Sequence, residues 1–209
     1  MQAICMDMSK SYRSAVEQFL PEVDIVFDRF HVMQLVTKAI DKVRGKQQKQ
    51  MDEENCKTLK GNRFLLLANY ENLTPDETER LDIALSVNAP LFIIHTMKEQ
   101  LRLLWSKPSR KIGRRFLATW IMDAIEAADN YHKITEAKVL EPLRKLAHTL
   151  MKHFRGILNF FDHPVTNGKI EGINNKIKTL KRQAYGYRDN EYFKLRLLHL
   201  HKQKTRLAG

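Results

Sequence analysis

Two short apolar runs with one helix-like segment between them constrain the fold of this chain most. Residues 2–6 and 23–27 have the composition of buried strands, and each run ends at an aspartate, Asp7 or Asp28. The intervening residues 10–20 carry apolar side chains at helical spacing. A strand, helix, strand crossover makes the two strands parallel, so Asp7 and Asp28 should leave one sheet at the same edge. Binding and catalytic sites of open α/β sheets lie at that edge.

After the second strand the sequence predicts helices only. Residues 30–49 form the first of them, and the later segments are separated by turns that contain Gly or Pro, with Thr74-Pro75 as a typical helix start. We therefore predict an α/β start with two parallel strands, followed by a large all-α insertion, in a chain that is mostly helical overall. The expected apolar faces are formed by Tyr12, Ala15, Val16, Phe19, Val32, Leu35, Val36, Ala39, Ile40, Val43, Phe92, Ile93, Met97, Leu101, Leu104, Trp105, Phe116, Ile121 and Ile125.

A predicted helix over residues 167–182 places one carboxylate among cations and amides. Helical spacing puts Ile170, Ile173, Ile177 and Leu180 on a core stripe, and Glu171, Asn175, Lys178 and Arg182 on a neighbouring one. An acid in such a setting can bind a metal ion while its neighbours hold the phosphodiester that the metal polarises. Acids are also common in first helical turns, where they stabilise the helix dipole. At this level both interpretations of Glu171 stay open.

The charge of the chain is strongly positive and unevenly spread. Lys and Arg number 36 against 24 Asp and Glu, which gives a net charge of +12. Residues 165–209 hold eleven Lys and Arg against three Asp and Glu, so +8 of the +12 lies in this last part. This clustering favours a surface that binds nucleic acid over a charge that only maintains solubility.

Cysteine and histidine give little support for a metal site. Cys5 and Cys56 match no metal-binding spacing, and the sequence contains neither a signal peptide nor an apolar run that could span a membrane, so we expect a cytoplasmic protein. His31 is the histidine of most interest, because Asp28-Arg-Phe-His31 follows directly from the second strand. Asp28 could orient this imidazole near a site. A hydrogen bond at the start of the following helix explains the pair nearly as well.

Three stretches of the sequence resemble insertion-sequence transposases of the ISL-three family. They are Met-Asp-Met-Ser-Lys-Ser-Tyr around Asp7, Asp-Arg-Phe-His-Val from Asp28, and Asn-Gly-Lys-Ile-Glu-Gly-Ile-Asn-Asn-Lys-Ile-Lys-Thr-Leu-Lys-Arg-Gln-Ala-Tyr-Gly-Tyr-Arg from Asn167 to Arg188. The resemblance covers nearly the whole chain. It implies a DDE transposase with an RNase H-like catalytic domain, in which carboxylates hold two divalent ions, Mg²⁺ or Mn²⁺, while DNA ends are cut and joined to a target.

The resemblance also implies residue roles and domain boundaries. Asp7 would be the second catalytic acid and bridge the metals, and Glu171 would be the third. Asp28 and His31 would be accessory residues. DNA contacts would come from Asn175, Lys178, Lys181, Arg182 and Arg188. Residues 1–50 would form part of the RNase H-like core, residues 51–164 a helical insertion, and residues 165–209 the basic helices that complete the core.

The family's first aspartate has no counterpart in this sequence, and neither do its N-terminal DNA-recognition parts. We therefore expect the chain alone to be inactive and the complete enzyme to act on transposon ends and target DNA, as a homo-oligomer associated with the nucleoid. The main alternative is a basic helical protein that binds nucleic acid without cutting it. A helical scaffold with no nucleic-acid role is a third possibility, and it predicts scattered, interchangeable charge.

Overall fold

The computed structural model describes residues 2–49 and 61–206, apart from the side chains of residues 169, 170 and 200–206. Cys56 and residues 51–60 of the predicted insertion lie outside these ranges. Two compact units are present, residues 1–165 and residues 166–209, and each is described by itself. Within the described residues no helix is long and apolar enough to cross a membrane.

The first unit begins with the predicted strand, helix, strand element. Strand β1 (Ala3–Met6), helix α1 (Lys10–Phe19) and strand β2 (Asp24–Phe27) follow one another in the chain. The strands are parallel, with Ala3 opposite Asp24 and Met6 opposite Phe27. The prediction of an α/β start with two parallel strands is thereby confirmed.

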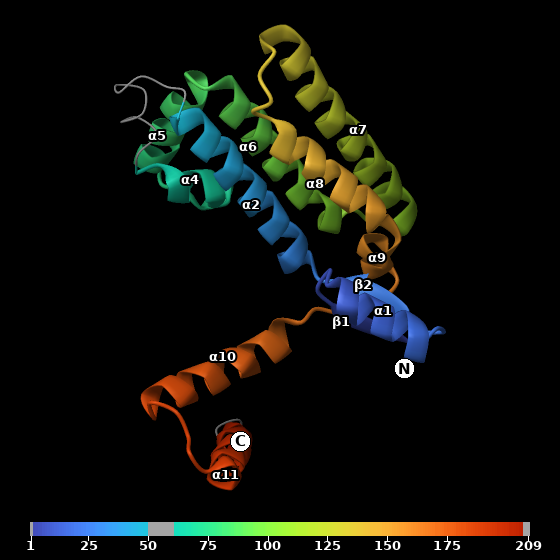
Figure 1. Ribbon diagram of the computed structural model, residues 1–209, viewed down its shortest axis with the longest axis vertical. Coiled ribbons are helices and arrows are strands. Elements are labelled where there is room, and N and C mark those ends of the chain that lie inside the picture. The colour runs from blue at the N-terminus through green and yellow to red at the C-terminus, as the bar shows by residue number, and fades with distance from the viewer. Residues whose placement is uncertain (1, 50–60, 207–209) are drawn as a thin grey trace. The chain divides into compact units, whose positions relative to one another are not determined.

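The remainder of the first unit is helical, as predicted. It contains α2 (Arg29–Gln48), α4 (Arg63–Leu67), α5 (Pro75–Ser86), α6 (Ala89–Arg102), α7 (Arg110–Thr135), α8 (Glu141–Lys152) and α9 (Phe154–Leu158), with short 3-10 turns at Tyr70–Asn72, Leu103–Ser106 and Asn159–Phe161. Helices α2, α6, α7 and α8 lie side by side as a bundle (Figure 1). Their buried faces form one core, which includes Val36, Ile40, Leu101, Trp120 and Leu143.

Side chains at the helix starts explain several of these boundaries. Thr74 caps α5 in a reciprocal arrangement, because its hydroxyl accepts from the N–H of Glu77 at 3.3 Å and the Glu77 carboxylate accepts from the N–H of Thr74 at 2.9 Å. Asn88 caps α6 by accepting from the N–H of Leu91 at 3.0 Å. Ser109 caps α7 in the same way through Ile112.

Four residues of the first unit that we expected to be inward are exposed. Phe92 on α6 is 54% exposed, Tyr12 and Phe19 on α1 are 62% and 73% exposed, and Ala15 on α1 is also exposed. In α6 the core face is formed by Leu91, Ile94, Met97 and Leu101, so Phe92 falls outside the stripe that packs against α2 and α7. Within α1 only Val16 is buried. Helical spacing therefore predicted the helices correctly but assigned too many residues to their buried faces.

The second unit consists of α10 (Gly168–Gln183) and α11 (Asn190–Arg206). Leu180 is its buried apolar residue among the described side chains, Ile177 is half-buried, and Ile173 is 39% exposed. The core stripe expected for this helix is therefore only partly buried within its own unit. Two residues shortly after the end of α10 have positive φ, Tyr185 at 51° and Gly186 at 99°. The N–H of Gly186 donates back to the carbonyl of Lys181 at 2.9 Å, which closes the last turn.

Candidate functional site

Asp7 follows directly from β1 and has a fixed orientation. Its side chain is half-buried, and Oδ1 accepts a hydrogen bond from the N–H of Ser9 at 2.9 Å. That bond holds the carboxylate at the turn between the strand and α1, and Oδ2 takes no part in it. An oriented carboxylate at the carboxyl end of a parallel strand is suited to binding a divalent cation.

Asp28 occupies the equivalent position after β2. Since Met6 and Phe27 are opposite each other in the ladder, Asp7 and Asp28 leave the sheet at the same edge. The Asp28 side chain is only 3% exposed, and its Oδ1 accepts from the N–H of Phe30 at 2.9 Å. It is the N-cap of α2. This is the helix-start hydrogen bond that the sequence offered as one explanation of the Asp28 and His31 pair.

His31 lies on the first turn of α2. Its ring meets the Phe30 ring edge to face, with centroids 5.8 Å apart. The buried Nδ1 atom has no hydrogen-bond partner among the described residues. A buried imidazole nitrogen without a partner loses the hydrogen bond that it would make with water. The accessory role of His31 stays a prediction.

Glu171 lies in the second unit, in the first turn of α10 as the sequence predicted. Its N–H donates to the carbonyl of Asn167 at 2.8 Å, and its side chain is half-buried. Asp7 and Glu171 belong to different units, so the hypothesis that both carboxylates bind metal at one site stays a prediction. Among the described residues there is no group of three or more His, Cys, Asp or Glu side chains that could hold a metal ion.

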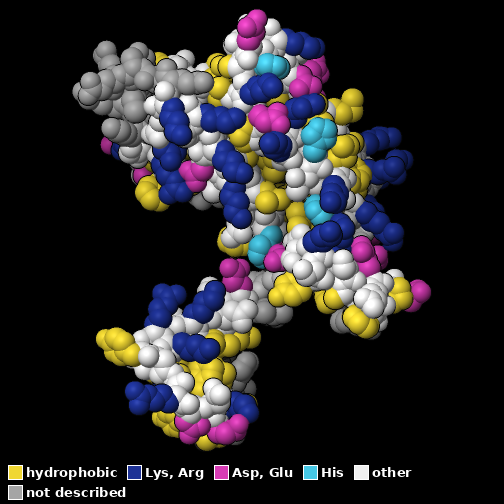
Figure 2. Space-filling model, in the orientation of Figure 1, with side chains coloured by type: hydrophobic (Ala, Val, Ile, Leu, Met, Phe, Trp, Pro, Cys, Tyr) yellow, Lys and Arg dark blue, Asp and Glu magenta, His cyan; other side chains and the backbone are white. Residues whose placement is uncertain are grey.

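The residues of α10 and of the following loop that are predicted to contact DNA are exposed, and the cations among them have no acidic partner in the described residues. Lys and Arg side chains stand out over this helix (Figure 2). Lys181 lies over the ring of Phe193, 4.9 Å from its centroid, which orients this side chain. The five predicted contact residues are all exposed: Asn175, Lys178, Lys181, Arg182 and Arg188. None of the four cations among them has a carboxylate within 4.0 Å in the described part of the chain.

A second group of cations was missed at the level of sequence. Three lysines of α2 and the lysine that directly follows this helix line a groove between α2 and α8: Lys38, Lys42, Lys46 and Lys49. Their spacing of four, four and three residues was the available signal, because it places all four on one face of a helix.

A buried ionic network was also missed. Lys98 on α6 is 2% exposed, and its ammonium donates to the carbonyl of Leu66 at 2.9 Å and pairs with Glu99 at 2.8 Å. Next to it, burial and then the charge of Lys98 lower the pKa of His95 to about 4. The carbonyl at the end of α4 thus takes its hydrogen bond from a side chain of α6. This network connects α6 with α4 and lies apart from Asp7 and Asp28 in the sequence.

Comparison with known proteins places these features in a family context. The model of a transposase family, the ISL-three group, matches residues 1–197. The transposase for insertion sequence element IS1001 of Bordetella parapertussis is 34% identical over 201 residues, which cover 94% of this chain and 46% of that protein. The transposase for insertion sequence element IS1557 of Mycobacterium tuberculosis is 29% identical over 135 residues, which cover 65% of this chain and 28% of that protein. The chain therefore spans less than half the length of these relatives.

A third relative has a different kind of name. A protein of Lactococcus lactis named ATP-dependent protease is 30% identical over 104 residues, 48% of this chain and 33% of that protein. This match covers less of the chain than the two transposase matches do. No solved structure gives a significant match to the chain.

Proposed function

We propose, from the premise that this chain belongs to the ISL-three family of insertion-sequence transposases, that it supplies two of the three catalytic carboxylates of a DDE-type enzyme. The reaction is metal-dependent cleavage of DNA at transposon ends and joining of those ends to a target. One observation carries the proposal. Asp7 leaves β1 at the carboxyl edge of a parallel pair, with Oδ1 fixed by Ser9 and Oδ2 free of that bond.

The carboxylates of Asp7 and Glu171 would hold divalent metal, Mg²⁺ or Mn²⁺. Two such ions, about 4 Å apart, supply an activated hydroxyl nucleophile and stabilisation of the leaving oxygen in phosphoryl transfer. Carboxylate oxygens are the ligands these hard cations prefer. The two strands would belong to a larger RNase H-like sheet, and the remaining acid would come from elsewhere in a complete transposase. Because this chain spans 46% of the IS1001 transposase, that activity is proposed for the longer enzyme.

The residues of α10 have a separate task in this proposal. Asn175, Lys178 and Arg182 lie on the stripe of Glu171 and would bind the phosphates on either side of the scissile bond. They are exposed and have no carboxylate partner among the described residues, which leaves their donors available to a ligand. Lys181 and Arg188 would extend the contact along the DNA backbone. The complete enzyme would act as a homo-oligomer on two DNA ends.

The rival proposal is a basic module that binds nucleic acid without cutting it. Asp28 supports it, because its carboxylate oxygen is engaged in capping α2 and the same explanation could extend to Glu171. A metal-binding experiment on the present chain separates the two proposals. Bound Mn²⁺ broadens the amide resonances of nearby residues, so a single shared site would broaden the resonances of both Asp7 and Glu171.

We expect Mn²⁺ to broaden both regions and the effect to be lost in Asp7→Asn and in Glu171→Gln. Glu191→Gln is the matched control, because Glu191 is also a first-turn acid of a basic helix. In the longer transposase Glu171→Gln should abolish DNA cleavage and Glu191→Gln should not. Broadening that spares Glu171, together with normal cleavage by Glu171→Gln, would establish that the catalytic site lies elsewhere.

A further inference from the structure

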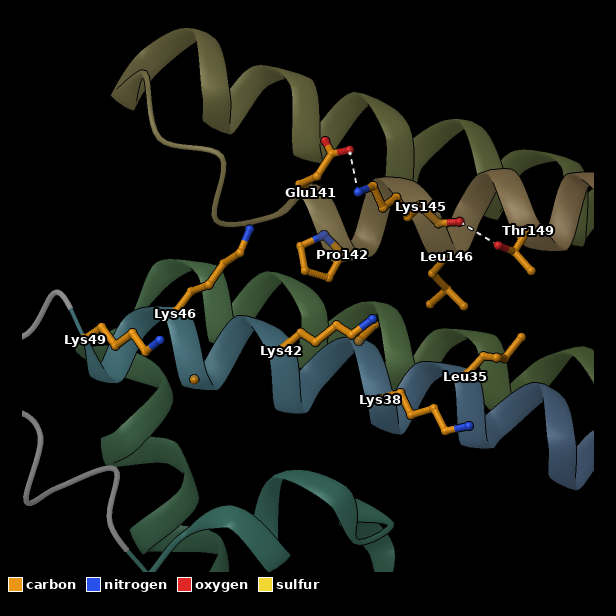
Figure 3. Close-up of a pocket in the computed structure, with 12 residues that line it drawn as sticks. Leu35, Lys38, Lys42, Lys46, Lys49, Glu141, Pro142, Lys145, Leu146 and Thr149 are labelled. Atoms are coloured by element: carbon orange, nitrogen blue, oxygen red, sulfur yellow. Dashed lines mark hydrogen bonds and ion pairs between the residues drawn. The ribbon is translucent and has the colours of Figure 1, made fainter.

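A groove between α2 and α8 gathers positive charge in the first unit. It holds about 560 Å³ of open space, and Figure 3 shows the lysines of α2 along one side and residues of α8 along the other. Five of its twelve lining residues are Lys and one is Glu. Glu141 lies 3.8 Å from Lys145, so this carboxylate is already shared with a lysine of its own helix.

The lysines form a regular row. Lys38, Lys42 and Lys46 follow one another at intervals of four residues, which is about 6 Å along a helix, and Lys49 extends the row to about 16 Å. All four side chains are exposed. Figure 2 shows Lys and Arg side chains gathered over α2. A row of evenly spaced cations is complementary to a polymer with evenly spaced anions.

The row has no neutralising partners within the described residues. None of its four lysines has a carboxylate within 4.0 Å there, and Lys46 donates to a backbone carbonyl, that of Lys138, at 2.7 Å. The acid on the same helix, Asp41, is occupied by Arg63 at 2.7 Å and Arg44 at 3.6 Å. Like charges four residues apart on a helix destabilise it. A bound polyanion would remove that cost.

The groove carries apolar as well as charged surface. Ala39, Pro142 and Leu146 are buried, whereas Leu35 on α2 is half-buried and lines the groove. An amphipathic acidic peptide would use both kinds of surface. Phosphate groups need only the lysine rim, and duplex DNA, the substrate in the proposed function, supplies them in a regular series.

We propose that the row of Lys38, Lys42, Lys46 and Lys49 binds the phosphate backbone of duplex DNA, as a second contact surface in addition to α10. This inference rests on the proposed function, because DNA is the substrate there. A row about 16 Å long can contact several phosphates of the duplex. The groove would hold DNA on the helical region of the protein, where no catalytic residue is proposed.

The test compares three variants of the whole chain, each lacking three positive charges. The groove variant is Lys38→Gln, Lys42→Gln and Lys49→Gln, which spares the Lys46 bond to Lys138. The α10 variant replaces Lys178, Lys181 and Arg182 by Gln. The control variant replaces three exposed lysines outside the groove by Gln: Lys111, Lys133 and Lys152. Affinity for one duplex is measured across a salt series, after circular dichroism has shown that each variant is folded.

We expect the groove variant to lower the slope of log K against log salt by about 2.7, since each phosphate contact contributes about 0.9. The control variant should lower it by less than about 1. Equal slopes for the groove and control variants, with a lower slope for the α10 variant, would overturn the groove inference and leave the proposed function standing. Failure of the unaltered chain to bind duplex DNA at low salt would overturn both.

A second measurement needs no variant. Acetylation of lysines in the unaltered chain, read by mass spectrometry, should fall at Lys38, Lys42 and Lys49 when DNA is bound and remain unchanged at Lys111 and Lys133. Protection of the groove lysines by an acidic amphipathic peptide but not by DNA would assign the groove to a protein partner and contradict the inference.

Discussion

The backbone N–H of Asp28 donates to the carbonyl oxygen of Met6 at 3.1 Å. This bond continues the parallel ladder to the residue that follows β2, so the chain leaves both strands at one edge. Asp7 and Asp28 then differ in what their carboxylates do: Asp7 binds the N–H of Ser9 in a turn, and Asp28 caps α2. Two aspartates at one sheet edge therefore have separable roles.

Replacement of Asp28 should affect stability through the helix cap. We expect Asp28→Ala to lower the free energy of unfolding by about 1 kcal/mol, and up to about 2, because the N–H of Phe30 loses its acceptor. Asp28→Asn keeps an acceptor oxygen and should stay within about 0.5 kcal/mol of the unaltered protein. Urea unfolding of the two variants measures the difference. Equal losses would show that the negative charge, and not the cap, is what the fold requires.

Replacement of Gly156 should disturb the contact between α9 and the sheet. A Cβ atom on Gly156 would lie 2.5 Å from the ring of Phe27, so Gly156→Ala should destabilise the protein by roughly 1–3 kcal/mol. Gly45 is the matched control, because a Cβ there meets nothing within 4 Å and α2 continues through it. Gly45→Ala should stabilise by up to about 1 kcal/mol.

A double-mutant cycle identifies the cause of the Gly156 effect. Phe27→Leu removes the ring that a Cβ would meet, so adding Gly156→Ala to this variant should cost less than it does in the unaltered protein. Fully additive losses in thermal or urea unfolding would contradict the proposed clash.

Replacement of Lys98 should remove the cation that joins α6 to the end of α4. Lys98→Met leaves the carbonyls of Leu66 and Ala68 without this donor and removes one of the two cations that pair with Glu99, the other being Arg102. We expect a loss of at least about 2 kcal/mol in the free energy of unfolding. Lys111→Met, an exposed lysine on α7, should change it by no more than about 0.5 kcal/mol. Similar values for both variants in urea unfolding would rule out a structural role for the network.

The pH dependence of stability should report the burial of His95. Burial, and then the charge of Lys98, lower the pKa of His95 to about 4 from an ordinary 6.5. Between these values the unfolded chain binds more protons than the folded one, so stability falls as the pH decreases from about 6.5 to 4. A comparison of unfolding at pH 7.0 and pH 5.0 should show a smaller loss in His95→Gln.

Glu71 titrates in a separate range and does not obscure that result. Its hydrogen bonds from Arg102 lower its pKa to about 2 from 4.5, so the stability linked to it is lost only as the pH falls below about 4.5. If His95→Gln shows the same loss between pH 7.0 and pH 5.0 as the unaltered protein, another group is responsible.

The basic face of α10 should govern salt dependence in its own right. Neutralising Lys178, Lys181 and Arg182 should weaken binding to different duplexes about equally, because phosphate contacts carry no base information. Binding to duplexes of unrelated sequence, measured at two salt concentrations, checks this. A change in sequence preference would mean that these side chains reach base edges.

The sequence by itself determined the parts of this protein that depend on local chemistry. The strand, helix, strand start, the end of α1 before Pro21 and the start of α5 at Thr74 follow from patterns and caps within a few residues of one another. The position of Glu171 in the first turn of α10 was likewise predictable from the local sequence. These features need no knowledge of what packs against them.

The tertiary structure alone decided which faces are covered and which charges meet. Phe92 is exposed and Lys98 is buried on the same helix, because the neighbours of α6 cover one side of it and supply carbonyls to the ammonium. The groove likewise depends on α8 lying beside α2, more than ninety residues later in the chain. Periodicity predicts a face, but burial and charge complementarity are properties of two surfaces in contact, and the sequence of one helix contains only one of them.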